Sequence, residues 1–270
     1  MLSKLIRYEW KAVARVCIPM YGGLILAAML THFLLGNLER FSSTLYDIIT
    51  MAMSTLCFGL FMAAFVLTLI IQIQRFSKNL LGDEGYIMFT LPASVHQHVW
   101  SKLIVSAVWF IATGVVVFLS VFVAAFNVSF LTDLASVFPK LFQQMTAYYA
   151  VNGTVFALEL LALMLAACMS FSLQFYAALA AGHSFANHKM ALSVAFFFVF
   201  QFVVQMAGAI VLVLLDEGPL HQFLLTLDFQ LTGVAAVHFT MVALLLLTVL
   251  YGAIFYIVTT ITLKKRLNLE

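Results

Sequence analysis

Six long runs of apolar residues constrain this 270-residue chain more than any other feature of its sequence. A helix needs about 20 residues to cross a hydrocarbon layer of about 30 Å, and each run reaches that length. The first three runs carry no formal charge, and the fourth contains a single acid, Glu159. The runs cover residues 16–35, 48–73, 103–126, 154–181, 190–215 and 235–263.

These runs indicate helices rather than strands. Hydrocarbon leaves unpaired backbone amides without partners, so only helices and closed barrels span it. Barrel strands alternate in polarity over about ten residues, whereas these runs are continuously apolar. Charged residues make up only 9% of the chain, against about 25% in soluble domains. The sequence therefore predicts an all-α polytopic membrane protein, with residues 1–270 as a single transmembrane domain of six spans.

The basic residues predict the orientation, because Lys and Arg concentrate in cytoplasmic loops. If the N-terminus is inside, all the basic residues except Arg40 and Lys140 lie on the inner side. We therefore expect both termini to be cytoplasmic. The inner segments are then 1–15, 74–102, 182–189 and 264–270.

The first 15 residues have the pattern of an amphipathic helix. Their apolar residues share one face and their basic residues the opposite one, which favours a helix lying flat in the membrane interface. A plain cytoplasmic extension of the first span is the alternative. The residues assigned to the interfacial helix are Arg7, Glu9, Trp10 and Lys11.

The second inner connection is too apolar for a flexible linker and too interrupted for a span. Gly82 is expected to end the preceding helix in a left-handed cap, and Pro92 prevents its continuation. Ser94 and Gln97 then have the spacing of a capping box for the next helix. Between these signals, residues 83–91 form an apolar knuckle with an acidic tip. It is expected either to dock into a partner or to pack on its own helix ends.

Three stretches resemble the permease subunits of ABC-2 type transporters, particularly small six-span permeases of Gram-positive bacteria. The stretches are LIRYEWK, FSKNLLGDEGYIMFTLP and HQHVWSKLIVS, at residues 5–11, 76–92 and 96–106. The expected six spans and the extracytoplasmic segment before the last span are similar to that family as well. The motifs cover about a fifth of the chain, and the remainder is similar in layout.

The resemblance implies a type V exporter-like fold, with an N-terminal interfacial elbow helix over residues 2–14 and a coupling helix within 76–92. That helix would dock on a separate ATP-binding subunit through Asp83, Glu84, Gly85, Tyr86 and Phe89. Two ATPase copies and a second permease chain, identical or homologous, would complete an exporter in the bacterial plasma membrane. Its substrate would be a lipid, a peptide or antimicrobial compound, or another amphipathic molecule.

The chain itself is expected to be non-catalytic. It has no G-x-x-x-x-G-K-[ST] phosphate loop, so ATP and Mg²⁺ are expected on the partner. Its three cysteines lack metal-ligand spacing, and no paired carboxylates or nucleophile elbow appear. No basic patch interleaved with aromatic residues suggests nucleic-acid binding.

A few polar residues within the spans are candidates for a translocation path. An intramembrane acid such as Glu159 is a functional candidate by default, and a position at the interface is the alternative. Gln201 and Gln205, one turn apart, are expected to face a pore or a partner helix. Interhelical hydrogen bonds are expected from Gln72, Gln74 and Gln174 as well. His183 and His188 lack metal spacing and fit a solvated inner turn.

Two other function classes remain open. One is a membrane structural or assembly protein without transport activity. The other is a secondary transporter, a class that usually shows more spans, inverted repeats and broken midplane helices. The sequence contains no internal repeat and only one candidate acid for ion coupling.

The charge distribution predicts where the C-terminus lies. A reporter that matures only in the cytoplasm, fused after Glu270, is expected to be active, because the basic residues hold the 264–270 end inside. The same reporter inserted after Arg40 is expected to be silent. Activity of a periplasm-specific or exterior-specific reporter at Glu270 would refute this topology.

Overall fold

The computed structural model describes most of the chain. The described residues are 2–38, 43–82, 84–85, 90, 93–124, 136–137, 139–140, 143–144, 152–185, 187–216 and 234–265.

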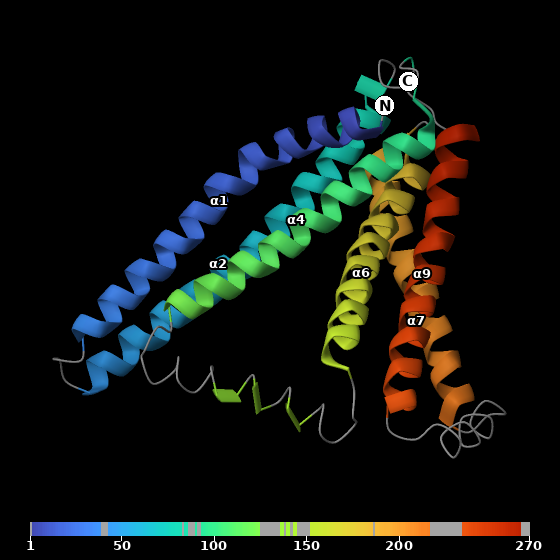
Figure 1. Ribbon diagram of the computed structural model, residues 1–270. Helices are drawn as coiled ribbons and strands as arrows, with labels where there is room; N and C mark the ends of the chain where they lie inside the picture. The colour runs from blue at the N-terminus through green and yellow to red at the C-terminus, as the bar shows by residue number, and fades with distance from the viewer. Residues whose placement is uncertain are drawn as a thin grey trace. The chain divides into compact units, whose positions relative to one another are not determined.

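Six long α-helices make up this part of the chain, and they appear as coiled ribbons in Figure 1. Each is long and apolar enough to cross a membrane, and the described residues contain no strand. This confirms the prediction of an all-helical membrane protein with six candidate spans. The helices are α1 (Leu2–Leu38), α2 (Ser43–Phe76), α4 (Val95–Ala124), α6 (Gly153–Gly182), α7 (Lys189–Asp216) and α9 (Val234–Lys265).

The predicted bounds agree best for the last three helices, which begin and end within two residues of the expected spans. Helix α1 differs, because it continues without a break from Leu2 through the first span and includes Pro19. A separate interfacial elbow over residues 1–15 is therefore not confirmed. Proline removes one backbone hydrogen bond, and α1 continues through it.

The chain divides into two compact units. Unit 1 contains residues 1–75 and 100–138, and unit 2 contains residues 76–99 and 139–270. The prediction that the whole chain forms one transmembrane domain stays a prediction.

Unit 1 is built from α1, α2 and the larger part of α4. Its apolar core contains Val13 and Cys17 of α1 together with Val105 and Trp109 of α4. Hydroxyl groups connect the three helices: the Thr113 hydroxyl lies 2.8 Å from that of Tyr21 and 3.0 Å from that of Thr68. Since an isolated hydroxyl is costly to bury, these bonds help to fix which helix faces pack together.

Unit 2 is built around α6, which packs against both α7 and α9. Glycines let the helices approach closely. A Cβ at Gly252 of α9 would lie 3.3 Å from the Ser170 Cβ of α6, and one at Gly182 would lie 2.6 Å from the Ser193 Cα of α7. Small residues at such contacts are typical of helix packing in membranes, where close backbone approach strengthens dispersion attraction.

The connecting segment, residues 76–99, joins the two units in an unexpected way. It belongs to unit 2, although α2 up to Arg75 and α4 from Trp100 belong to unit 1. Helix α2 runs into a turn of π-helix, Ser77–Leu81, and ends at Gly82. Gly82 is extended (φ −99°, ψ −167°), so the predicted left-handed cap is wrong.

A capping box contains two hydrogen bonds, and one of the two predicted for the start of the next helix is confirmed. The Ser94 Oγ accepts a hydrogen bond from the Gln97 backbone N–H at 3.3 Å, just before α4 begins. That bond satisfies one of the amides that a helix N-terminus leaves without a partner.

The tight contact at Gly182 predicts the stability of a variant. Gly182→Ala is expected to destabilise unit 2 by about 2 kcal/mol, because the added methyl group meets the Ser193 backbone and the two helices must separate. Gly208→Ala on α7 is the control, since its Cβ would meet nothing within 4 Å. Thermal unfolding in detergent measures both. Equal melting temperatures for the two variants would contradict the packing described for α6 and α7.

Candidate functional site

A buried charge cluster of three residues joins the helices of unit 1. The Glu9 carboxylate of α1 contacts Arg75 Nε of α2 at 2.7 Å and Lys102 Nζ of α4 at 2.6 Å. Lys102 Nζ also donates to the Arg75 backbone carbonyl at 3.2 Å. Glu9 and Lys102 are buried, and Arg75 is partly covered. Each helix contributes one charge, so the cluster holds all three together.

Glu9 is buried, whereas the other residues assigned to the interfacial helix are not. Arg7, Trp10 and Lys11 are exposed, as a face toward solvent or headgroups requires. Glu9 is only 5% exposed, on the face that packs against α2 and α4. The sequence offered one signal for this role: no basic residue lies three or four positions from Glu9, so its charge has no partner within its own helix.

The cluster lies directly beside the connecting segment. Arg75 is the last residue before that segment, and Lys102 follows its end by three residues. The helices that enter and leave the segment are thus fixed to α1 where they meet it.

Within unit 2, the connecting segment is anchored at both of its ends. The ring of Phe76 stacks on Tyr176 of α6, with centroids 4.0 Å apart and planes within 6°. At the other end, His96 Nδ1 lies 2.6 Å from the Tyr256 hydroxyl of α9, and His96 Nε2 lies 2.9 Å from Lys264 Nζ. An ammonium group only donates, so Nε2 accepts and the His96 proton resides on Nδ1.

The predicted coupling residues are only partly described. Glu84 is exposed and Gly85 is buried, and the Gly85 N–H donates to the Gly82 carbonyl at 2.8 Å. Asp83, Tyr86 and Phe89 lie outside the described residues. The acid at the tip is therefore available to a partner, whereas Gly85 supports the turn beneath it.

A chain of hydrogen bonds crosses unit 2 through its glutamines. The Tyr251 hydroxyl of α9 donates to Gln174 Oε1 of α6 at 2.8 Å, and Gln174 Nε2 donates to Gln201 Oε1 of α7 at 2.8 Å. Interhelical bonding is thus confirmed for Gln174 and Gln201. Gln205, by contrast, is exposed on α7.

In unit 1, the predicted interhelical hydrogen bond is confirmed for Gln72 and not for Gln74. Gln72 Nε2 donates to the Ser106 carbonyl at 3.2 Å, whereas Gln74 is exposed.

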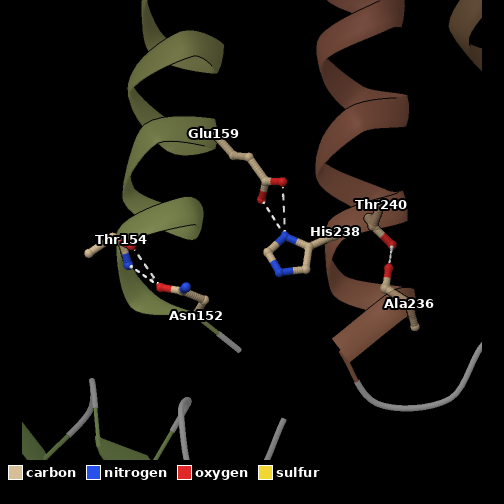
Figure 2. A network of polar contacts seen from close by, with 6 residues as sticks. All are labelled: Asn152, Thr154, Glu159, Ala236, His238 and Thr240. Atoms are coloured by element: carbon tan, nitrogen blue, oxygen red, sulfur yellow. Dashed lines mark hydrogen bonds and ion pairs between the residues drawn. The ribbon is translucent and has the colours of Figure 1, made fainter. Parts of the chain in front are cut away.

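The second group of charged residues is the acid–histidine pair of Glu159 and His238. Figure 2 shows the two side chains pointing toward one another from α6 and α9. His238 Nδ1 lies 2.9 Å and 2.8 Å from the two carboxylate oxygens. Both side chains are partly covered, with 19% of Glu159 and 24% of His238 exposed. The cap of α6 lies nearby, where Asn152 Oδ1 accepts from the Thr154 N–H (Figure 2).

Sequence reasoning found Glu159 and missed its partner. The available signal was the position of each residue in its helix. Glu159 lies six residues after the start of α6 and His238 four residues after the start of α9, and both helices are expected to begin at the same side of the membrane. Helices that run parallel bring such positions together.

The two histidines of the inner turn have different surroundings. His188 is exposed as expected and has a positive φ of 56°. His183 is buried, which corrects the prediction of a solvated position. Its backbone N–H and its Nδ1 both contact the Leu179 carbonyl, which caps α6. Burial, with help from the Lys189 charge, lowers the pKa of His183 below its usual 6.5, so the ring is neutral at pH 7.

The described residues contain no group of three or more His, Cys, Asp or Glu side chains that could hold a metal ion. Comparison with protein-family models, with characterised proteins and with solved structures finds no match to this chain. What the geometry itself offers is a charge cluster beside an anchored connecting segment, and an acid–histidine pair within two spans.

The charge cluster predicts the effect of neutralising its acid. Glu9→Gln is expected to destabilise the protein by about 3 kcal/mol, because two cations then lose their buried counter-charge. Asp47→Asn on α2 is the matched control, since Asp47 is exposed and is expected to change stability by less than about 0.5 kcal/mol. Thermal unfolding in detergent provides the comparison. A Glu9→Gln melting temperature equal to that of the control would mean that the cluster does not hold the helices.

Proposed function

We propose that this chain is the transmembrane permease subunit of an ATP-driven exporter of the ABC-2 type, coupled to a separate ATPase through the connecting segment. The observation that carries the proposal is the assignment of residues 76–99 to unit 2 while the helices on both sides of it belong to unit 1. The sequence resemblance at the same residues supports it independently.

The contacts of the connecting segment give this proposal a physical route. A push on the segment acts on α6 through the Phe76–Tyr176 stack and on α9 through His96. The covalent chain passes the same push to α2 and α4, which the charge cluster ties to α1. A docked ATPase that closes on ATP would thereby shift one unit with respect to the other. Such a shift is what alternating access requires.

The energy source is assigned to a partner, because the sequence has no phosphate-binding loop. The complex would contain two ATPase copies and two permease chains in a bacterial plasma membrane, with both termini of this chain cytoplasmic. The cargo would be a lipid, a peptide or another amphipathic molecule.

A secondary transporter is the second candidate, and the acid–histidine pair is the observation in its favour. Paired acids and histidines within spans carry protons in many ion-coupled transporters. In that case transport would follow a proton gradient in vesicles that contain this chain alone.

Substitution of Glu84, the exposed acid of the connecting segment, tests the proposed exporter function. The chain is purified together with the ATP-binding subunit that co-purifies with it, and ATP hydrolysis and subunit recovery are measured in lipid nanodiscs. Glu84→Lys is expected to reduce both at least tenfold, because it reverses a charge at the docking surface. Asp47→Lys, an exposed acid on α2, is the control and is expected to leave both unchanged.

Two outcomes would overturn the proposal. One is full ATPase recovery and activity with Glu84→Lys. The other is solute movement by this chain alone, driven by a proton gradient without ATP, which would establish the second candidate.

A further inference from the structure

The Glu159 carboxylate has unused capacity to accept hydrogen bonds. Both of its oxygens contact a single atom, His238 Nδ1, which carries at most one proton. Among the described residues, His238 is the one donor to this carboxylate, although a carboxylate offers about four acceptor positions. Nearly a fifth of the Glu159 side chain is exposed, so a ligand has access to it.

The surroundings of the pair combine this polar group with an apolar surface. Val155 and Leu158 on α6 are exposed, as are Phe239 and Val242 on α9. Glu159 lies six residues after Gly153, or about 9 Å along α6 from its first residue. A molecule with a polar head and an apolar tail would fit both features.

The charges on the packed helices favour a cation. Over the described side chains of α6, α7 and α9, no other titratable group lies within two turns of the pair; Asp216 ends α7 at the same expected side. An unbalanced carboxylate charge within a membrane span is costly, and a cation can supply the balancing charge.

We propose that Glu159 and His238 form a binding site for the primary ammonium head of an amphiphile. The ammonium N–H groups donate to the acceptor positions of the Glu159 oxygens that His238 leaves free. The positive charge of the ammonium group balances the negative charge of the carboxylate. Assigning this amphiphile as cargo rests on the proposed exporter function, whereas binding itself does not.

The chemistry of the site distinguishes an ammonium from other cations. A primary ammonium has three N–H donors for the free acceptor positions of the carboxylate, and a quaternary ammonium has none. Divalent metals need several oxygen ligands, and the described residues provide no such group. The ligand could be a free alkylamine or the ethanolamine headgroup of a membrane lipid, since the two share this chemistry.

The experiment measures binding of radiolabelled dodecylammonium to the full-length chain in phosphatidylcholine nanodiscs. Glu159→Gln is expected to lower the affinity at least tenfold, because the charge-assisted hydrogen bonds are lost. Thr240→Val, at an exposed residue two positions after His238 whose hydroxyl bonds only within α9, is the control and should bind as the unaltered protein does. Dodecyltrimethylammonium should bind the unaltered protein at least tenfold more weakly than dodecylammonium.

Nanodiscs containing phosphatidylethanolamine identify the source of the ammonium group. Competition by this lipid assigns the site to a membrane headgroup, and its absence assigns the site to a free amphiphile; both support the proposal. Equal affinity of Glu159→Gln and the unaltered protein, or of the primary and quaternary amines, would overturn it. The amine comparison needs no variant, so it stands even if Glu159→Gln fails to fold. Since no ATPase is present, failure of the exporter proposal would leave this result intact.

Discussion

Hydrocarbon offers no hydrogen-bond partner, and several polar side chains of these helices bond to groups on neighbouring helices; these bonds organise the fold. Glu9 draws two cations from two other helices. Gln174 bonds with both α7 and α9. Dispersion alone would allow apolar helices to slide or rotate against one another, whereas each of these bonds is satisfied in only one register. The two units therefore owe their specific packing to a few polar contacts within large apolar surfaces.

In unit 2 these contacts follow one helix along its length. Helix α6 bonds with α9 at Glu159, at Ser170 and at Gln174, and the partners on α9 occur in the same order along the chain. The two helices are thus parallel and held at three depths. The contact toward the N-terminal ends of the two helices is an acid–histidine pair, and the other two contacts join neutral groups. A ligand that separates Glu159 from His238 would release one end of this helix pair while the other end stays bonded.

The connecting segment contacts the opposite ends of the same two helices. Its anchors on α6 and α9 lie toward the C-terminal ends of the helices whose N-terminal ends carry the acid–histidine pair. A ligand at the pair and a partner at Glu84 would consequently act on the same two helices. In the proposed exporter, this shared helix pair would be the physical basis for coupling cargo binding to ATP hydrolysis.

The sequence by itself determined the class of protein and the helix positions, because both depend on local composition: apolar runs of sufficient length must be helical in hydrocarbon. The capping spacing of Ser94 and the single acid in the fourth apolar run, Glu159, could also be identified from the sequence, because both are local features. Only the tertiary structure decided that Glu9 is buried, that His183 is covered and that His238 faces Glu159. Those outcomes depend on which helices become neighbours, and apolar surfaces of similar character leave that choice open until specific polar contacts are made.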